Sequence, residues 1–359
     1  MIQTLAIETS CDDTSIWIIS FDGKIFKTQK LLAYSQIDDH QQYGWVVPEI
    51  ASRLHFDKII QVLKKILPAN RHGWFAKIPQ IDFISVTTHP WLPGSLVVGK
   101  AVANLLWAYY NKPVIETNHI HWHIFSILLE RDIHSIKFPM MVLTASGWHN
   151  DIYFVTMSQW KNATIKHFNI TKIWHTLDDA AWECFDKVSR MLGGPYPWWL
   201  WISQKALQWK PNPQYQFKRI FLSKDKFEFS FSWMKSQVYK LLQNLEKKSV
   251  SLSDPIICDI AYEFQEAVVE VLAKKLLQAA EKYQTPSIAI AGWVSSNDRL
   301  REYLNNLSLK HSNLPTGQAG LPSGQVNIQT FKPTKKVYST DNAAMIWVAG
   351  ILKYLKMIE

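Results

Sequence analysis

The chain has 359 residues, of which 47% are hydrophobic, so it can bury a large core and is long enough for two domains or one duplicated domain. It contains no run of 18 apolar residues, its start lacks the features of a signal peptide, and its three cysteines are widely spaced; this excludes a membrane span and a disulfide framework and predicts a cytoplasmic protein. A net charge of +9 favours a polyanionic partner.

The N-terminal part of the chain alternates strands and helices. Residues 4–26 predict three strands, the first two joined by a polar turn and the last two by an Asp-Gly hairpin. Residues 45–67 carry apolar side chains at helical spacing, and residues 82–110 predict a strand, a Gly/Pro loop and a long helix. Residues 112–130 repeat the order of strand and helix.

The pattern then restarts, because residues 138–158 again predict a strand, a small polar turn and a strand. Residues 175–283 are mostly helical, and residues 287–304 predict a buried strand, a tight turn and a capped helix. Residues 313–325 contain a near-duplicate without apolar periodicity, which predicts a low-complexity surface insertion, and residues 338–356 predict an N-capped helix. Two halves that open alike predict an α/β fold of two related lobes around a cleft.

The segment "NHIHWH" is the sharpest local motif. His119 and His123 are four residues apart, so on a helix they share one face, while His121 points elsewhere. This spacing suits one divalent metal ion, and it suits equally a surface pair of histidines without metal. Two histidines are too few for a closed site, and the best distant ligand is Asp341 in "STDNAA", a residue that also suits simple N-capping.

Three other motifs carry residues suited to ligand chemistry. "ETSCDDT" places Glu8, Asp12 and Asp13 around a turn, where carboxylates hold a metal-bridged phosphate, orient a reacting group or are only solvated. "TASGWHND" and "AGWVSSN" are turns of small residues after apolar strands, which permit the close backbone approach that a bound phosphate needs. Asp186 lies two turns into a helix that starts with acidic residues, a position typical of a solvent-facing side chain.

Taken together and in order, these segments resemble the TsaD family, the universal tRNA threonylcarbamoyladenosine-forming transferases that were formerly named O-sialoglycoprotein endopeptidases. The matching segments are "AIETSCDDT", "YGWVVPEIASRLH", "PWLPGSLVVG", "NKPVIETNHIHWH", "FPMMVLTASGWH", "TLDDAAWECFDKVSRMLG", "FSFSWMKS", "IAGWVSSNDRLRE" and "YSTDNAAMIWVAG". The resemblance covers almost the whole chain apart from the insertion around residues 313–325.

The resemblance implies a two-lobed actin-like, Hsp70-like ATPase fold of duplicated ribonuclease-H-like lobes. The N-terminal lobe would span residues 1–135, with the C-terminal helix 340–359 packed back on it, and the second lobe residues 136–339, with the helical insertion 175–283. The implied enzyme is an acyltransferase that moves a threonylcarbamoyl group from threonylcarbamoyl-adenylate to the exocyclic amine of the adenosine adjacent to the anticodon, in tRNAs that read codons beginning with A. Besides tRNA and the adenylate, the implied partners are a scaffold paralogue and a small ATPase. No membrane is implied as a partner.

The resemblance also assigns site residues by position. His119, His123 and Asp341 match the ligands of one divalent metal ion, for which iron is favoured over zinc or magnesium. Asp13 matches an acidic position in the first loop and is the candidate for proton removal from the amine. The matched contacts to the adenylate are Thr144, Ala145, Ser146, Gly147, Trp148, Asp186, Trp199 and Asn297.

Tryptophan is unusually frequent, with 17 residues against 13 glycines. It stands at eleven positions where the family has glycine, namely Trp45, Trp91, Trp122, Trp148, Trp174, Trp182, Trp198, Trp199, Trp209, Trp233 and Trp293. Independent mutations would not choose one residue type so consistently, so we predict that the gene uses UGA as a glycine codon. The alternative is a genuinely tryptophan-rich protein whose rings stack on RNA bases. Trp148 and Trp199 would then crowd the adenylate site.

Two other functions belong to the same superfamily. A non-catalytic scaffold paralogue would lack the metal site, so the retained His119, His123 and Asp341 argue against it. A small-molecule kinase would phosphorylate a sugar or an acid at the expense of ATP, and paired histidines are not expected there.

Overall fold

The computed structural model describes residues 1–67, 80–145, 150–159, 166–195, 198–208, 215–219, 230–312, 328–339 and 343–358. The chain forms two compact units: unit 1 is Met1–Ile136, Thr156–Asn169 and Lys332–Glu359, and unit 2 is Lys137–Val155 and Ile170–Phe331. The lobe boundaries given above stay a prediction. Among the described residues, no helix combines the length and the apolar character needed to cross a bilayer.

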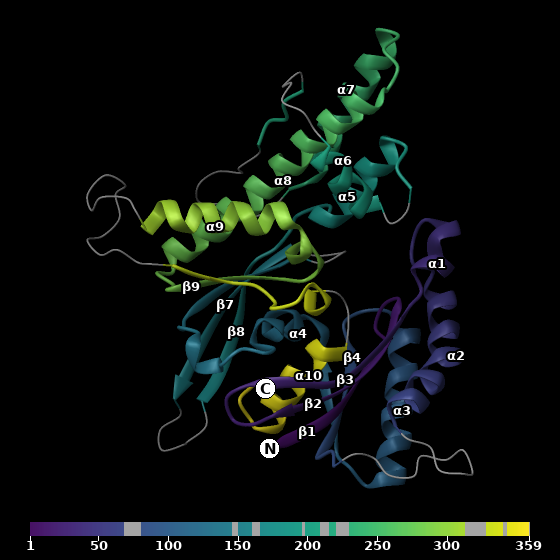
Figure 1. Cartoon of the computed structure of the whole chain (residues 1–359), viewed down its shortest axis with the longest axis vertical. Helices are drawn as coiled ribbons and strands as arrows, with labels where there is room; N and C mark the ends of the chain where they lie inside the picture. Colours follow the sequence, from purple (N-terminus) through teal and green to yellow (C-terminus); the bar gives the residue numbers. More distant parts are fainter. Residues whose placement is uncertain are drawn as a thin grey trace. The chain divides into compact units, whose positions relative to one another are not determined.

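Unit 1 is built on a five-stranded sheet with the order β3-β2-β1-β4-β5 (Figure 1). The first three strands are antiparallel neighbours, whereas β4 runs parallel to β1 and β5 parallel to β4. The strands are β1 (Ile2–Glu8), β2 (Asp13–Phe21), β3 (Phe26–Ser35), β4 (Phe83–His89) and β5 (Val114–Asn118). The helices are α1 (Ile37–His40), η1 (Gln41–Tyr43), α2 (Pro48–Ile66), α3 (Pro93–Tyr110), α4 (His119–Phe125), η2 (Ser126–Leu128), η3 (Ile133–Ser135), η5 (Lys336–Ser339) and α10 (Ala343–Tyr354).

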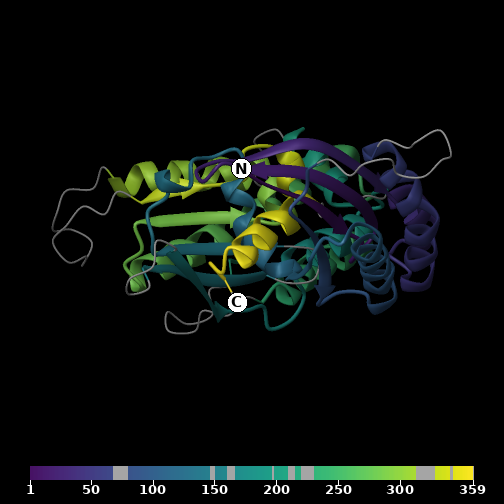
Figure 2. The ribbon, with the colours of Figure 1, turned by 90° about the horizontal axis from the view of Figure 1, so that it is seen from below.

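Helices cover both faces of this sheet. Side chains alternate along a strand, so Ile84 and Val86 of β4 join the core formed with α2 and α3. On the opposite face Phe83 stacks on Tyr354 of α10 at 4.5 Å between ring centroids. Helix α10 also contacts β1, β5 and α4, and it lies across the first strands in both ribbon views (Figure 1 and Figure 2). The C-terminal helix is therefore part of unit 1.

Unit 2 repeats the same strand order, β8-β7-β6-β9-β10. Strand β6 is antiparallel to β7 and parallel to β9, which in turn is parallel to β10. The strands are β6 (Met140–Ala145), β7 (Asn150–Gln159), β8 (Lys166–Trp174), β9 (Ser287–Ala291) and β10 (Gln329–Phe331). The helices are α5 (Ala181–Met191), α6 (Trp198–Leu207), α7 (Ser232–Lys247), α8 (Asp254–Lys282), η4 (Trp293–Ser296) and α9 (Asp298–Ser312).

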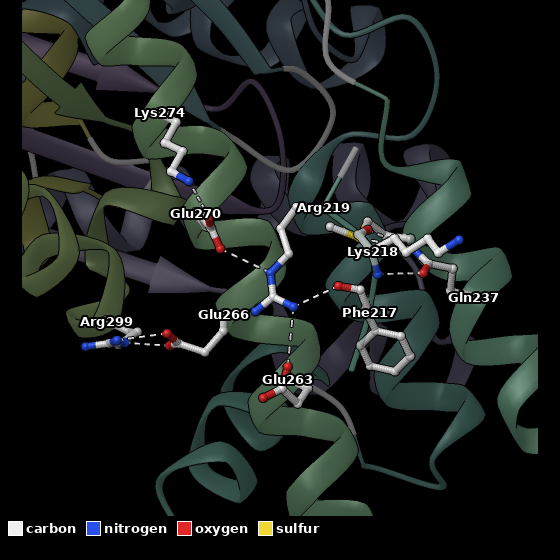
Figure 3. A network of polar contacts seen from close by, with 10 residues as sticks. Phe217, Lys218, Arg219, Gln237, Glu263, Glu266, Glu270, Lys274 and Arg299 are labelled. Carbon is white, nitrogen blue, oxygen red and sulfur yellow. Dashed lines mark hydrogen bonds and ion pairs between the residues drawn. The ribbon is translucent and has the colours of Figure 1, made fainter. Parts of the chain in front are cut away.

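The long helix α8 organises unit 2 through an apolar face and a charged face. Its apolar side chains join the main core cluster. Figure 3 shows the charged face, where Arg219 Nε donates to Glu270 at 3.1 Å and Arg219 Nη1 lies 3.4 Å from Glu263. Arg299 of α9 donates twice to the Glu266 carboxylate, at 2.5 and 2.8 Å (Figure 3). These ion pairs fix residues 215–219 and α9 on α8.

The predicted elements are confirmed where the structure describes them. The Asp-Gly hairpin between β2 and β3 has Gly23 at φ +97°, and Asp22 Oδ1 accepts the Lys24 and Ile25 backbone N–H groups. The predicted helix over residues 45–67 is α2, with Pro48 at its first turn. The predicted insertion at residues 313–325 lies outside the described residues.

Candidate functional site

Unit 1 places two buried histidines of α4 side by side. Asn118 Oδ1 accepts the Ile120 N–H at 2.8 Å and so starts the helix directly at His119. Because His119 and His123 are four residues apart, they lie on one face of the helix. Their Nε2 atoms are 3.0 Å apart, and both side chains are fully buried. The predicted pairing of these two histidines is confirmed.

Buried polar groups fix the orientation of the first histidine. Ser10 Oγ lies 3.0 Å from His119 Nδ1, and Glu8 Oε2 lies 4.0 Å from the same nitrogen. The Glu8 carboxylate also accepts the Ser10 backbone N–H and, at 2.5 Å, the Thr87 hydroxyl. A His119 ring that donates Nδ1–H to Ser10 turns the Nε2 lone pair towards His123.

This donor set fits a divalent metal ion. Nitrogen ligands bind zinc and similar ions at about 2.1 Å, so two neighbouring ligands lie about 3.0 Å apart at a right angle and about 3.4 Å apart in a tetrahedral site. The two Nε2 atoms, 3.0 Å apart, lie at the lower end of this range. Glu8 is 1% exposed, and a carboxylate at this depth is stabilised by a nearby cation. Within the described part of the chain, no group of three His, Cys, Asp or Glu side chains suited to a metal occurs. Asp341, the predicted third ligand, lies outside that part.

The loop between β1 and β2, residues 9–12, is called the first loop here. Its three consecutive carbonyl oxygens, those of Ser10, Cys11 and Asp12, each accept a hydrogen bond. The donors are the Leu92 N–H at 3.2 Å, His55 Nε2 at 2.9 Å and the Gln36 N–H at 3.1 Å, from three separate segments.

Helix α3 also presses on the first loop. A Cβ at Gly99 would lie 2.6 Å from Thr9 Oγ1, and that hydroxyl donates to the Ser95 carbonyl at 2.8 Å. The absence of a side chain at Gly99 therefore lets the helix approach the loop closely. Asp13, the predicted proton acceptor, follows the loop as the first residue of β2 and is partly buried.

Burial keeps His55 neutral and makes the stability of the protein depend on pH. Desolvation is the largest cause of a pKa of about 4 for His55, against 6.5 for an exposed histidine. Between pH 6.5 and pH 4 the unfolded chain therefore binds a proton that the folded chain excludes, so stability present above pH 6.5 is lost as the pH falls. The loss attributable to His55 is about 3 kcal/mol across that range.

We expect this loss to disappear in His55→Gln. Urea unfolding of both proteins at pH 7.5, 6 and 5 measures it, and the free energy of unfolding of the wild type should fall more steeply than that of the variant. Equal slopes would contradict the assignment.

In unit 2, taken by itself, the ends of β6 and β9 lie beside each other. Thr144 and Ala145 close β6, and Gly292 follows β9 with φ +80°. A Cβ at Gly292 would lie only 2.6 Å from the Ala145 carbonyl oxygen. The end of β6 and the residue that follows β9 thus meet at backbone contact distance, which only glycine permits at position 292.

Asn297 and Asp186 occupy different settings in unit 2. Asn297 Oδ1 accepts the Leu300 N–H at 3.0 Å and caps α9, while its Nδ2 donates to Gln265 of α8 at 3.0 Å. Asp186 lies in the middle of α5 and is only partly exposed, so the solvent-facing position considered above is only partly correct. Their roles as ligand contacts stay predictions.

Several predicted site residues cannot be placed. Ser146, Gly147 and Trp148 lie outside the described residues, as does the side chain of Trp199 in α6. The pKa of His121, which lies between the paired histidines on α4, is lowered to about 4 by burial first and then by His89 and Lys353.

Sequence reasoning missed three residues that contact predicted site residues within their own unit, namely Ser10 and Thr87 in unit 1 and Gln265 in unit 2. Ser10 stands in the same motif as Glu8, and the alternation of these two polar residues at the end of a strand was a usable signal. Thr87 and Gln265 carry no such signal, because a single polar residue in an apolar strand or helix has many structural explanations.

Comparison with known proteins decides the family. A family model described as tRNA N6-adenosine threonylcarbamoyltransferase, TsaD, matches residues 28–348. The chain belongs to the TsaD family. A curated member of that name from Staphylococcus epidermidis is 36% identical over 350 residues, which cover 98% of this chain and 91% of the relative. Another from Mesoplasma florum is 36% identical over 345 residues, 96% of each protein.

Solved structures support the fold of this TsaD-family chain. Full-length HypF in its phosphate- and nucleotide-bound form matches 99% of the chain with a TM-score of 0.56 and 12% identity. HypF from T. kodakarensis matches with a TM-score of 0.54 and 11% identity. The chain spans about half of those proteins, 55% and 48%. The predicted α/β fold of the actin-like type is confirmed.

Proposed function

We propose that this chain is a tRNA N6-adenosine threonylcarbamoyltransferase. It would transfer the threonylcarbamoyl group from threonylcarbamoyl-adenylate to the exocyclic amine of the adenosine adjacent to the anticodon, in the cytoplasm. Relatives of that name match over almost the full length. The observation that carries the proposal is the buried His119–His123 pair, oriented by Ser10 and Glu8, within this family fold.

The test is a transfer assay with purified protein. Unmodified tRNA, a separately prepared threonylcarbamoyl-adenylate and the candidate partner proteins are incubated with the chain, and the tRNA is digested to nucleosides for mass spectrometry. A threonylcarbamoyl adduct on adenosine supports the proposal. ATP-dependent phosphorylation of a sugar or an acid, without that adduct, would contradict it.

The proposed cofactor is one divalent metal ion held by His119, His123 and Asp341. Imidazole nitrogens suit iron and zinc, whereas magnesium prefers oxygen ligands, so the donor set favours iron or zinc. When bound, such an ion polarises a carbonyl as a Lewis acid. Glu8 and Ser10 hold the His119 ring in the tautomer that binds a metal, because Ser10 Oγ accepts a hydrogen bond from Nδ1–H and leaves the Nε2 lone pair available.

The chain's own residues supply binding and proton transfer. The donor is an activated mixed anhydride, so orientation of the two substrates is the main task. We assign the adenylate to the strand ends of unit 2 around Thr144, Ala145 and Gly292, because small residues let a phosphate approach backbone N–H groups closely. The Gly292 backbone there lies too close to the Ala145 carbonyl oxygen for any side chain at position 292. Asp13, the first residue of β2 after the first loop, would accept the proton that the amine loses.

Exposed apolar side chains on two helices of unit 1 support the proposal that the chain binds protein partners. On α2, Phe56 and Ile60 are one turn apart and are 72% and 38% exposed. On α3, Val97, Leu105 and Tyr109 lie on one stripe and are each more than 60% exposed. Adjacent helices with such faces are typical of a protein-binding surface, which supports the proposed scaffold paralogue and small ATPase.

We also propose that the native protein carries glycine at the tryptophan positions that match family glycines. Trp45 is 67% exposed and Trp233 is 51% exposed, so these two side chains contribute little burial. Trp17 stands where the family tolerates glycine or alanine. It is fully buried, and among the described residues its indole N–H has no hydrogen-bond acceptor. Such an unsatisfied donor costs about 1–3 kcal/mol.

Peptide mass spectrometry of the protein from its native source tests the recoding. We expect glycine at positions 45, 182 and 233, a loss of about 129 Da per site relative to tryptophan by elementary composition. Tryptophans that the gene encodes by a codon other than UGA serve as the internal control, and they should be found as tryptophan. Tryptophan at all three positions would contradict the recoding and leave the transferase proposal with a crowded adenylate site.

A further inference from the structure

A chain of buried hydrogen bonds joins the start of α2 to the first loop. The Val47 N–H donates to His40 Nδ1 at 3.3 Å, and His40 Nε2 lies 3.1 Å from Gln36 Oε1. Gln36 Nε2 lies 3.3 Å from His55 Nδ1, and His55 Nε2 lies 2.9 Å from the Cys11 carbonyl oxygen. His40, Gln36 and His55 are fully buried.

The ends of this chain fix its direction. A backbone N–H can only donate and a carbonyl oxygen can only accept, so His40 accepts at Nδ1 and donates from Nε2. Gln36 then accepts through its oxygen, and its nitrogen shares the single Nδ1 lone pair of His55 with the closer Thr14 hydroxyl. His55 donates from Nε2 to the Cys11 carbonyl. Both histidines are therefore neutral and carry their proton on Nε2.

His55 holds both ends of a short acidic segment. Its Nε2 bonds the Cys11 carbonyl, and its Nδ1 accepts the Thr14 hydroxyl at 2.7 Å. The residues between these two contacts are Asp12 and Asp13. Of the three donors to consecutive carbonyls of the first loop, His55 alone uses a side chain. Removing that side chain leaves a buried carbonyl, a buried hydroxyl and the Gln36 amide without their partner at His55.

We propose that His55, oriented by Gln36 and His40, is a positioning residue for the first loop. His55 bonds both ends of the segment that contains Asp13 and so positions Asp13 directly. It positions His119 indirectly, because Cys11, which His55 bonds, is adjacent to Ser10, and Ser10 contacts His119. The inference rests on the proposed function, because it assigns the purpose of the loop to metal binding and proton transfer. Loss of an outer hydrogen-bond partner of a metal ligand typically weakens metal binding 10- to 100-fold. His55 is one hydrogen bond further from the metal ligand than Ser10, so we expect its loss to weaken metal binding by about 10-fold, the lower end of this range.

The experiment measures Co²⁺ affinity of the purified full chain by visible absorption, at pH 7.5. We expect His55→Leu to bind Co²⁺ about 10-fold more weakly than the wild type. His55→Gln keeps one donor and one acceptor at a similar reach, and we expect it to remain within about threefold. His134→Leu removes an exposed histidine of unit 1 and serves as the matched control, with unchanged affinity.

Two further variants separate the possible failures. If His119→Ala abolishes Co²⁺ binding while a folded His55→Leu binds as tightly as the wild type, the positioning role is wrong and the metal centre stands. If His119→Ala has no effect on Co²⁺ binding, the proposed metal centre itself fails. Where His55→Leu does not fold, Thr14→Val removes only the hydroxyl at Nδ1; affinity lowered about threefold supports the role, and unchanged affinity overturns it.

In the transfer assay His55→Leu should lower kcat and leave the KM for tRNA unchanged, because a displaced Asp13 affects the chemical step and not tRNA docking. A raised KM with unchanged kcat would overturn the assignment. Recovery of kcat by His55→Gln distinguishes positioning from a general loss of folding.

Discussion

His119→Ala is expected to abolish binding of the proposed metal ion and to reduce threonylcarbamoyl transfer by about 10³-fold. The ring supplies one of two nitrogen donors 3.0 Å apart, and a single remaining histidine cannot hold the ion with a carboxylate alone. A metal acting on a carbonyl contributes several kcal/mol to transition-state stabilisation, and each 1.4 kcal/mol corresponds to a factor of ten in rate. Metal content by elemental analysis and the initial rate of adduct formation are the two measurements.

Glu8→Gln provides a graded version of the same experiment. The amide keeps the size of the buried side chain and removes its negative charge next to His119, so we expect metal affinity to fall by 10- to 100-fold without loss of the fold. The control is His134→Ala. Full activity of metal-free His119→Ala would show that the histidine pair is structural.

Gly292→Ala is expected to impair both stability and transfer. The added methyl group would meet the Ala145 carbonyl oxygen at 2.6 Å, and the residue would have to keep φ +80°. A left-handed backbone conformation costs a non-glycine residue about 1–2 kcal/mol, and relief of the clash requires the turn after β9 to move away from the end of β6. A displacement of about 1 Å in a substrate-binding turn lowers a rate by about 10²-fold.

Unit 2 offers a matched control for this variant. Gly193 has a similar φ of +77°, but a Cβ there meets no atom within 4 Å. Gly193→Ala therefore carries the same backbone cost without the clash, and the difference between the two variants isolates the contact with Ala145. Urea unfolding and the transfer rate should both separate them. If the two variants have the same stability and the same transfer rate, the close contact between Gly292 and Ala145 contributes to neither.

The sequence predicted the parts of this fold that depend on local chemistry. The Asp-Gly dipeptide fixed one hairpin, and Pro48 with its apolar spacing fixed α2, because turn residues and periodicity act within a few residues. The pairing of His119 with His123 followed from helical spacing alone.

Contacts between distant segments were harder to foresee. Thr87 reaches Glu8 across 79 residues, and Gln265 reaches Asn297 across 32, through strand pairing and helix packing that no local pattern specifies. The chain of buried hydrogen bonds from Val47 to Cys11 was not predicted from the sequence for the same reason. Its histidines are buried at positions where a sequence pattern expects apolar residues, and His55 occupies one such position on the inner face of α2.

The repeated strand order has an evolutionary consequence. Since β3-β2-β1-β4-β5 corresponds to β8-β7-β6-β9-β10, the first loop after β1 and the segment 146–149 after β6 are topological counterparts. A duplicated ancestor would have carried two copies of one loop, and the copies have since diverged in composition. The first loop carries the carboxylate Asp12, which is followed directly by Asp13, whereas the other loop begins with Ser146 and Gly147. Duplication would have let one copy take on the proposed metal and proton-transfer role while the other took on the proposed adenylate contacts.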